Sequence, residues 1–540
     1  MKSPSLLSVK NLNVTISNST ILEKISFELQ KNEILAFVGE SGSGKSITAF
    51  SIINLFNSKK LQQKGKIFFN GDRIDSMSNK EFEKIRGSQI SMIFQEPMSS
   101  LNPSMKCGNQ VIETILKHKI IKPKKSVLHV LDLFQKVRLK NPKVVFNKYP
   151  HELSGGQQQR VMIAIAISCD PKILIADEPT TSLDGIVKGE IICLLKEIQE
   201  KTKMSLIFVS HDLNLVSKFA NNIIVLNKGV VVESGETSQV FNNPQNAYTK
   251  MLLNSRTPKK IRPERLPTIE NKLKKYPLIS KKDREERHQK IYSKEAVLKV
   301  KNLSFSYNEK LILSNINFDI YKGETLGLIG ESGSGKSTIV KSILNINNYR
   351  KGEIFYKNID IKKYNNIDFR KSIQLVFQDP YSSLNPEIRI GNSIMEPMIA
   401  HNIYENDEER SSRVDQLLED VGLRKSDFKK YPREFSGGQR QRIVIARALS
   451  LSPDVLICDE SVSALDVSVQ AQVLNLLNNL KEKFSFTFLF ISHDLSIIKY
   501  MCDRVIILKK GVIEEVSETD KLFKNPSRNY TKKLLKANGY

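Results

Sequence analysis

The sequence contains no apolar run long enough to cross a lipid bilayer. A membrane-spanning helix needs about 20 predominantly apolar residues, whereas the stretches 34–38 and 484–491 are far shorter and lead into polar motifs. Residues 1–10 have no long apolar core before charged residues return, which argues against a signal peptide. With 40% hydrophobic and 26% charged residues, we expect a soluble globular protein without a membrane span of its own.

Cysteine is also scarce. The five cysteines are Cys107, Cys169, Cys193, Cys458 and Cys502, and none of them lies in a CxxC spacing. This pattern argues against a zinc site, an iron–sulfur cluster and a disulfide framework, and it fits a reducing cytoplasm.

Basic residues outnumber acidic ones, 83 to 58, which gives a formal net charge of +25. Such an excess suits a nucleic acid or an anionic membrane surface as a partner. Lysine, asparagine and isoleucine are frequent along the whole chain, however, so we favour a general drift in composition over a single basic patch. We therefore expect no nucleic acid as a partner.

The chain of 540 residues is too long for one ordinary domain, and it repeats itself. The matched segments are 9–12 and 300–303, 39–46 and 330–337, 94–103 and 377–386, 149–157 and 431–439, and 243–250 and 525–532. Because the motifs come in the same order twice, a whole domain is duplicated. We predict a first domain over residues 1–254, a linker over 255–295 and a second domain over 296–540.

The predicted linker contains Pro258, Pro263, Pro267 and Pro277 among clustered charges, with little apolar periodicity. Such composition is typical of a tether, and we interpret its charges as a solvated segment. A tether raises the effective concentration of each domain for the other. We therefore expect the two domains to pair within one chain.

A phosphate-binding loop follows an apolar strand in each copy. In the first copy, the run 34–38 leads into Gly-Glu-Ser-Gly-Ser-Gly-Lys-Ser and then into a helix-compatible stretch from Ile47 to Phe56. The glycines let backbone N–H groups converge on a triphosphate, and the helix N-terminus adds partial positive charge. Lys45 can reach the outer phosphates, and the Ser46 hydroxyl can ligate Mg²⁺. The predicted loop residues are Gly39, Glu40, Ser41, Gly42, Ser43, Gly44, Lys45 and Ser46, and Gly330, Glu331, Ser332, Gly333, Ser334, Gly335, Lys336 and Ser337.

Paired carboxylates end a second apolar strand in each copy. They are Asp177 with Glu178, and Asp459 with Glu460. The aspartates are placed to hold Mg²⁺, and the glutamates can polarise the attacking water, because phosphoryl transfer needs mainly positioning and charge neutralisation. A third strand ends at Ser-His-Asp in both copies, which makes His211 and His493 catalytic candidates.

Two further segments carry a family resemblance. Leu153-Ser-Gly-Gly-Gln157 and Phe435-Ser-Gly-Gly-Gln439 resemble the signature motif of ABC ATPases, and the resemblance covers nearly the whole chain outside the linker. It implies an α/β fold of two tandem P-loop NTPase domains, each with a RecA-like core, an antiparallel β subdomain and an α-helical subdomain. It also implies that the two cassettes pack head to tail, so that each ATP contacts the phosphate loop of one and the signature of the other.

The same resemblance assigns further site residues. Gln95 and Gln378 resemble the Q-loop glutamine, which touches Mg²⁺ or water, and Asp184 and Asp466 resemble the D-loop aspartate. The implied Mg²⁺ ligands are Ser46, Ser337, Gln95, Gln378, Asp177 and Asp459. The implied signature contacts to ATP are Ser154, Gly155, Gly156, Gln157, Ser436, Gly437, Gly438 and Gln439. Segments 98–150 and 381–432 have helical apolar spacing and are expected to form the helical subdomains that bind permeases.

The branch of the family is indicated by Ser-Ser-Leu-Asn-Pro after each Q-loop, which resembles the importers of peptides and nickel. That resemblance implies two integral-membrane permeases, an extracytoplasmic solute-binding protein and a peripheral position at the cytoplasmic face of the inner membrane. Oligopeptides, dipeptides, glutathione, nickel and microcin C-type compounds all stay open as solutes. The rival class is a soluble tandem ABC ATPase acting on ribosomes, although its linker is typically longer and helical. DNA-repair ABC ATPases would need zinc-binding cysteine pairs or a long coiled coil.

The two copies differ at one expected ATP contact. Tyr307 lies where the family stacks an aromatic ring on adenine, and the matching residue of the first copy is Ile16. A ring at this position is compatible with plain core packing as well as with base stacking. If it stacks, the Lys45 site should hold ATP less tightly than the Lys336 site, while both sites hydrolyse it.

Overall fold

The structure is a computed structural model that divides into two compact units. It describes residues 5–17, 19–56, 60–118, 123–180, 183–255, 257–258, 261–268, 276–349, 351–463 and 465–540. The first unit comprises Met1–Leu183 and Val187–Asn254, and the second contains Ser255–Tyr540. Among the described residues, no helix combines the length and apolarity that a membrane span requires.

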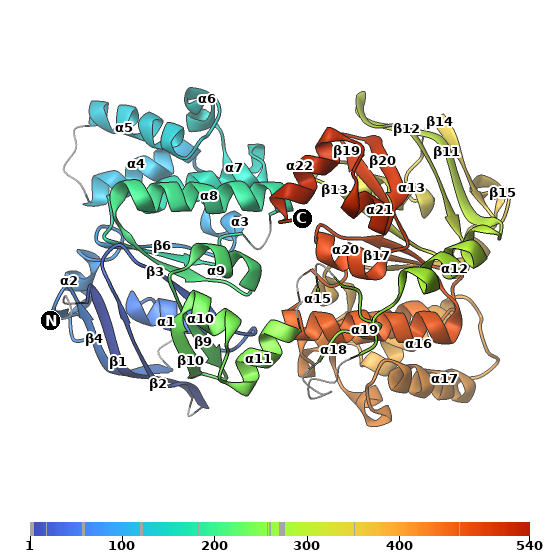
Figure 1. Ribbon diagram of the computed structural model, residues 1–540, viewed down its shortest axis with the longest axis horizontal. Helices are drawn as coiled ribbons and strands as arrows, with labels where there is room; N and C mark the ends of the chain where they lie inside the picture. The colour runs from blue at the N-terminus through green and yellow to red at the C-terminus, as the bar shows by residue number, and fades with distance from the viewer. Residues whose placement is uncertain are drawn as a thin grey trace. The chain divides into compact units, whose positions relative to one another are not determined.

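A six-stranded sheet forms the centre of the first unit, in the order β10-β9-β3-β8-β7-β6 (Figure 1). Its strands are β3 (Ile34–Val38), β6 (Ile90–Ile93), β7 (Ile173–Asp177), β8 (Ser205–Val209), β9 (Asn222–Asn227) and β10 (Val230–Glu236). Neighbours from β6 to β9 are parallel, and only β10 runs antiparallel. The carboxyl ends of β3, β7 and β8 therefore meet at one edge, which is where ligands bind in such sheets.

Both faces of the central strands β3, β7 and β8 are covered, which explains why these strands are almost entirely apolar and fully buried. Alternate residues of β3 point to opposite faces. Ala36 and Val38 pack in one hydrophobic cluster with the helices, whereas Leu35 and Phe37 pack in a second cluster with the other sheet. That sheet has the order β2-β1-β4-β5, with β1 (Leu7–Ile16), β2 (Ser19–Leu29), β4 (Leu61–Phe69) and β5 (Asp72–Arg73).

The helices of the first unit form two groups. Around the sheets are α1 (Lys45–Ile52), α2 (Asn79–Glu83), α8 (Gly185–Thr202), α9 (Leu213–Phe219), α10 (Thr237–Asn242) and α11 (Ala247–Asn254). A helical subdomain contains α3 (Pro97–Ser100), α4 (Cys107–His118), α5 (Pro123–Lys136), α6 (Pro142–Asn147), η1 (Pro150–Glu152) and α7 (Gly155–Ile167). Figure 1 shows α4, α5 and α6 gathered at one end of the unit. The prediction of helices over 98–150 is confirmed for its described residues, whereas α1 ends at Ile52, earlier than expected, because Asn54 adopts a left-handed φ of 48°.

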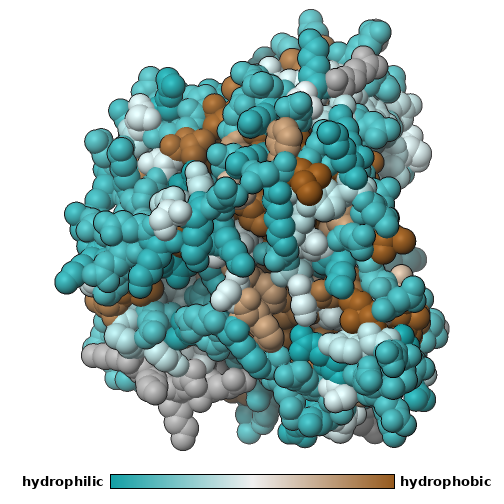
Figure 2. All heavy atoms as spheres, turned by 90° about the vertical axis from the view of Figure 1, so that its right-hand side faces the viewer, coloured by the Kyte–Doolittle hydropathy of each residue, from teal (hydrophilic) through white to brown (hydrophobic). Residues whose placement is uncertain are grey.

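The second unit repeats this architecture. Its sheets have the orders β16-β17-β18-β13-β19-β20 and β12-β11-β14-β15. The strands are β11 (Ala296–Tyr307), β12 (Lys310–Tyr321), β13 (Thr325–Gly330), β14 (Lys351–Tyr356), β15 (Ile359–Asp360), β16 (Ile373–Val376), β17 (Val455–Asp459), β18 (Thr487–Ile491), β19 (Arg504–Lys509) and β20 (Val512–Glu518). The helices are α13 (Lys336–Ile343), η2 (Ile361–Lys363), α14 (Asn366–Ser372), α15 (Pro380–Ser383), α16 (Ile390–Ala400), α17 (Asp407–Asp420), η3 (Lys425–Lys429), η4 (Pro432–Glu434), α18 (Gly437–Leu449), α19 (Val467–Phe484), α20 (Leu495–Met501), α21 (Thr519–Lys524) and α22 (Asn529–Ala537). Hydrophilic side chains cover most of the face in Figure 2, and the hydrophobic ones lie in separate patches. The predicted fold class is thus confirmed in both units.

The segment between the repeats carries structure of its own. Ser280 caps the N-terminus of helix α12 (Lys281–Tyr292), and its side chain and that of Asp283 form a capping box. The interpretation of the linker charges as solvated is right for Lys281, whose side chain is 83% exposed. It is wrong for Arg284, whose side chain is only 7% exposed, because that guanidinium pairs with carboxylates of the second unit.

Candidate nucleotide-binding sites

Each phosphate loop makes a turn that only glycine tolerates. Gly44 and Gly335 directly precede α1 and α13 with φ of 102° and 106°. A Cβ atom on Gly44 would lie 2.4 Å from Cδ2 of Leu22, and one on Gly335 would lie 2.5 Å from Cδ2 of Leu313. The loops therefore bring backbone N–H groups to a helix N-terminus, the arrangement that binds phosphate.

Each loop lysine donates hydrogen bonds to backbone carbonyls of its own loop. Nζ of Lys45 donates hydrogen bonds of 2.9 Å to the carbonyl oxygens of Gly39 and Glu40. Nζ of Lys336 makes the equivalent bonds, 2.8 Å to Gly330 and 3.0 Å to Glu331. Burial lowers the pKa of Lys336. Burial removes water from the ammonium group of each lysine. A bound anion at this helix N-terminus would replace that lost hydration.

A buried aspartate faces the loop serine in the first unit. The Ser46 hydroxyl donates a 3.1 Å hydrogen bond to Oδ1 of Asp177, which is 2% exposed. Burial raises the pKa of Asp177 to about 6, helped by the charge of Glu178 and opposed by the Ser46 bond. Burial likewise raises the pKa of Asp459. Carboxylate and hydroxyl oxygens fit a hard cation such as Mg²⁺, which would also relieve the cost of burying this charge.

The structure brings three of the predicted catalytic residues together in each unit. Oε2 of Glu178 accepts a 3.1 Å hydrogen bond from Nε2 of Gln95 and lies 3.1 Å from Nδ1 of His211. In the second unit, Oε2 of Glu460 is 3.1 Å from Nε2 of Gln378 and 3.3 Å from Nδ1 of His493.

The environment of these glutamates is unusual in two ways. Glu178 and Glu460 both have a φ of 46°, a strained value for a non-glycine residue that is often found at functional sites. Burial alone would raise the pKa of Glu460, but the hydrogen bond and charge of His493 hold it below its usual value. Glu460 is therefore held as a carboxylate, the form that can accept a proton, rather than as a neutral acid.

The signature serines begin helices. Ser154 caps α7, and its side chain accepts from the backbone of Gln157, whose side chain in turn accepts from the backbone of Ser154. Ser436 and Gln439 form the same capping box at α18. Ser154 and Gly155 are exposed, so this helix N-terminus is accessible to an anion. The pairing of each signature with the phosphate loop of the other unit stays a prediction.

Tyr307 and Ile16 occupy the same structural position in their two units. Each residue ends the first strand of its antiparallel sheet, as the last residues of β11 and β1. The Tyr307 side chain is 67% exposed. An exposed ring at the end of a strand suits a base-stacking role better than a core-packing role, although stacking on adenine stays a prediction.

One supporting residue was missed by the sequence reasoning. The hydroxyl of Tyr248 accepts a 3.2 Å hydrogen bond from the backbone N–H of Glu40 in the phosphate loop. Glu233 fixes the tail that carries this tyrosine by accepting from the backbone of Gln245 and Asn246 at 2.7 and 3.1 Å. The available signal was the repeated Tyr-Thr-Lys tail, at 248–250 and 530–532.

Comparison with known proteins agrees with this geometry. The family model described as "ABC transporter" matches residues 22–181 and 313–463, more than half of the chain. The chain belongs to the ABC transporter family. It carries two ABC ATPase cassettes in tandem and is an ATP-hydrolysing subunit. A second model, described as "Oligopeptide/dipeptide transporter, C-terminal region", matches residues 232–281 and places the ABC ATPase in the peptide branch.

Relatives of this ABC ATPase match it along nearly its whole length. The glutathione import ATP-binding protein GsiA of Escherichia coli strain K12 is 38% identical over 568 residues, covering 99% of this chain and 89% of the relative. GsiA of Shigella boydii serotype 4 is 39% identical with the same coverage. A solved structure of cbiO1 from Clostridium perfringens is 28% identical, covers 43% of this chain and 92% of its own, and has a TM-score of 0.40.

Proposed function

We propose that this ABC ATPase drives the import of a peptide-like solute by closing its two cassettes around ATP and reopening after hydrolysis. The observation that carries the proposal is the complete set of phosphate loop, paired carboxylates, glutamine and histidine in each cassette, with Glu178 and Glu460 held in nearly the same geometry. Both sites therefore hydrolyse ATP. Glutathione import ATP-binding proteins match 99% of this chain, and this match favours the proposed function over an action on ribosomes.

The residues of each site have separate roles in hydrolysis. The lysine exchanges its two carbonyl partners for phosphate oxygens, and the glycine loop supplies backbone donors. The glutamate orients and polarises the attacking water while the histidine and glutamine hold its carboxylate. Ser46, Gln95 and Asp177, with Ser337, Gln378 and Asp459, would hold Mg²⁺, which neutralises charge on the phosphates.

Head-to-tail pairing would complete both sites. Lys45 would share one ATP with Ser436 and Gly438, and Lys336 would share the other with Ser154 and Gly156. ATP that contacts both cassettes favours the closed pair, and loss of the outer phosphate removes that preference. Opening and closing are the movements that would be transmitted to the permeases.

Exposed apolar side chains recur around both Q-loops and support permease binding there. Phe94 and Phe377 are 36% and 54% exposed, and Met98 and Tyr381 are 64% and 62% exposed. On the next helix, Leu116 of α4 and Ile399 of α16 occupy matching positions and are about half exposed. Repeated exposure of apolar residues at one place of each cassette supports the proposal of two equivalent docking surfaces, one for each of two permeases.

The proposed solute is glutathione or a short peptide, delivered by an extracytoplasmic binding protein. This choice rests on the printed function of the relatives and on the matched oligopeptide/dipeptide region. Because the cassettes do not contact the solute, their residues cannot select between peptides. The proposed location is the cytoplasmic face of the cell membrane, where ATP and the permeases meet.

Reconstitution with the permeases and binding protein in proteoliposomes tests the proposal. ATP on the cassette side should drive uptake of radiolabelled glutathione or dipeptide, and Glu178→Gln/Glu460→Gln should abolish it. Met98→Glu/Tyr381→Glu should lose the permeases while keeping ATP binding. Ile359→Glu serves as a control, because this 49% exposed residue lies in β15, outside the helical subdomains. Co-purification with ribosomes in place of permeases would contradict the proposal.

A further inference from the structure

The segment between the cassettes is docked on the second cassette. We call residues 262–268 and 276–292 the strap. The two parts of the strap pair with each other. The N–H of Glu264 donates to the carbonyl of Pro277 at 2.9 Å, and the N–H of Ile279 donates to the carbonyl of Arg262 at 3.0 Å. Together with α12, this pairing gives the strap a defined shape before it meets the cassette.

A buried leucine forms the centre of the docking. Leu266 is fully buried in the hydrophobic cluster of the second cassette. The side-chain amide of Asn475 on α19 satisfies both backbone groups of Leu266, accepting from its N–H and donating to its carbonyl, each at 2.8 Å. Tyr500 adds a 3.3 Å hydrogen bond from its hydroxyl to the carbonyl of Glu264. Burial without unpaired backbone groups is the mark of a specific contact.

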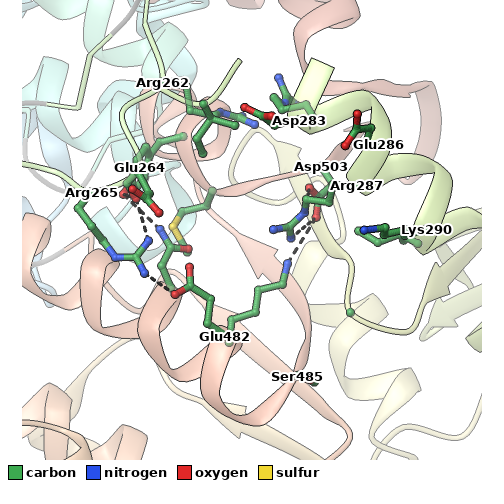
Figure 3. A pocket seen from close by; sticks show the side chains of 18 of the residues that line it. Arg262, Glu264, Arg265, Asp283, Glu286, Arg287, Lys290, Glu482, Ser485 and Asp503 are labelled. Carbon is green, nitrogen blue, oxygen red and sulfur yellow. Dashed lines mark hydrogen bonds and ion pairs between the residues drawn. The ribbon is translucent and has the colours of Figure 1, made fainter. Parts of the chain in front are cut away.

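Arginines flank this centre and meet carboxylates of the cassette. Arg265 donates to Asn479 at 2.8 Å and pairs with Glu482 at 2.6 Å. Arg287 pairs with Asp503 at 3.2 Å, and Figure 3 shows these two arginines on opposite sides of the groove that remains beneath the strap, about 930 Å³ in volume. Arg284 is bound by both Glu518 and Asp520. Such paired charges fix the register of a contact.

Asp503 connects the docking to the nucleotide site. Its carboxylate is 6% exposed and accepts a 2.8 Å hydrogen bond from the N–H of Thr325, the first residue of the strand that leads into the second phosphate loop. It also pairs with Lys481 at 3.4 Å. The strap therefore reaches a charge that is built into the core of the second cassette.

The first cassette has the same face but not the same residues. The matched positions are Asn475 and Cys193, Asn478 and Lys196, Asn479 and Glu197, Lys481 and Gln199, Glu482 and Glu200, Ser485 and Lys203, Tyr500 and Lys218, Asp503 and Asn221, Glu518 and Glu236, and Asp520 and Ser238. The second cassette carries one lysine and four carboxylates here, whereas the first carries three lysines and three carboxylates. The first cassette has a smaller cavity at this place, about 340 Å³, and Lys196, Lys203 and Lys218 line it.

We propose that the strap is a docking segment whose leucine and arginines select the second cassette, and that this docking shortens the tether between the cassettes to residues 255–261. Seven residues separate the end of α11 at Asn254 from Arg262, so the tether spans at most about 28 Å. A released strap would allow more than about 100 Å before the first strand of the second cassette. Docking thus limits how far the cassettes separate and raises their effective concentration. This second part rests on the proposed function, in which the cassettes open and close.

Two matched double variants test the docking. Arg265→Glu/Arg287→Glu reverses two docked charges, and Lys281→Glu/Lys282→Glu makes the same change at side chains that are 83% and 85% exposed. Amide hydrogen exchange in the full chain should show residues 262–268 protected in the parent and the control, and unprotected in the strap variant. Rapid exchange of this segment in the parent chain would overturn the docking.

An insertion variant separates tether length from other effects of the strap. Thirty-four Gly/Ser residues inserted between Thr257 and Pro258 lengthen the tether while leaving the strap docked. In the Glu178→Gln/Glu460→Gln background, energy transfer between dyes on the two cassettes reports ATP-driven closure. Because effective concentration falls roughly as the −3/2 power of tether length, both the insertion and the strap variant should need roughly tenfold more ATP for half-maximal closure.

The outcomes are distinguishable. If the cassettes of the insertion variant close at the same ATP concentration as those of the parent, tether length does not matter and the second part of the proposal is wrong. If the cassettes of no variant close with ATP, the proposed function is wrong. Amide hydrogen exchange of residues 262–268 alone then decides whether the strap docks. If the Lys281→Glu/Lys282→Glu control loses protection as well, general charge accounts for the contact and its selectivity is disproved.

Discussion

Nδ1 of His211 lies 3.1 Å from Oε2 of Glu178, and Gln95 donates to the same oxygen at the same distance. Two side chains from different segments therefore orient one carboxylate at the edge of the sheet. The arrangement recurs around Glu460. We therefore expect that replacing either glutamate by a weaker hydrogen-bond acceptor would remove its proposed action on water.

The first prediction concerns these glutamates. Glu178→Gln/Glu460→Gln should lower ATP turnover by roughly 10²- to 10³-fold, because a positioned base contributes about that much. ATP binding should persist, since the loop lysines and serines are unchanged. Phosphate release and equilibrium nucleotide binding measure the two effects, with Glu200→Gln as a control distant in sequence from the motifs. Turnover within a factor of three of the parent would contradict the assigned role.

The second prediction concerns Asp177 and pH. Its pKa is raised by burial to about 6, above the usual value near 3.8, so the folded protein binds its proton more tightly than the unfolded chain does. The contribution of this pKa shift to the free energy of unfolding is fully present below about pH 4, and it is lost as the pH rises through about 6. Asp177→Asn should therefore stabilise the metal-free protein at pH 7, by up to about 3 kcal/mol, while abolishing Mg²⁺-dependent hydrolysis.

Melting temperatures in EDTA measure this effect between pH 5 and 7.5. The melting temperature of the variant should rise relative to that of the parent as the pH increases from 5 to 7, and the difference should stay constant above pH 7. A difference that does not change with pH would mean that the charge of Asp177 is not its source. Asp170→Asn, at an exposed aspartate outside the site, should show no such trend.

The third prediction concerns the unequal adenine platforms. Tyr307→Ile should weaken ATP binding at the Lys336 site, and Ile16→Tyr should strengthen it at the Lys45 site, each by roughly 1–3 kcal/mol if the ring stacks on the base. Binding of an ATP analogue to single-site chains, made with Lys45→Ala or Lys336→Ala, measures each site alone. Equal affinities at the two unmodified sites would rule out the asymmetry.

The fourth prediction tests the crosswise pairing of motifs. In a Lys336→Ala chain, only the Lys45 site binds ATP tightly, so Ser436→Ala should weaken closure and Ser154→Ala should not. The reverse should hold in a Lys45→Ala chain. Each substitution removes an equivalent N-cap hydrogen bond, that of α7 or that of α18, and lowers the free energy of unfolding by about 1 kcal/mol. The two variants therefore control for each other. Equal effects of both serines in one background would contradict head-to-tail pairing.

Sequence reasoning reached most of the site because its residues lie in motifs. Lys45, Asp177 and His211 each follow an apolar strand, and parallel strands end at one edge, so their convergence could be expected. The duplication then distinguished these residues from chance matches. Even the helical subdomains could be expected from their apolar spacing.

The strap could not be predicted in this way. Leu266 is a single apolar residue in a charged, proline-containing segment, and its partner Asn475 lies 209 positions further along the chain. Nothing in local spacing connects Arg284 with Glu518. Tyr248 is an intermediate case, because its repeated tail was visible while its hydrogen bond to the phosphate loop needed the fold.

The bonds of Lys45 to the carbonyls of Gly39 and Glu40 also bear on the speed of the ATP cycle. The two bonds hold the ammonium group beside the loop, so exchanging them for bonds to phosphate oxygens would cost little further side-chain entropy. The same exchange runs backwards when nucleotide leaves. Capture and release of ATP would therefore change the partners of the lysine and little of its side-chain freedom.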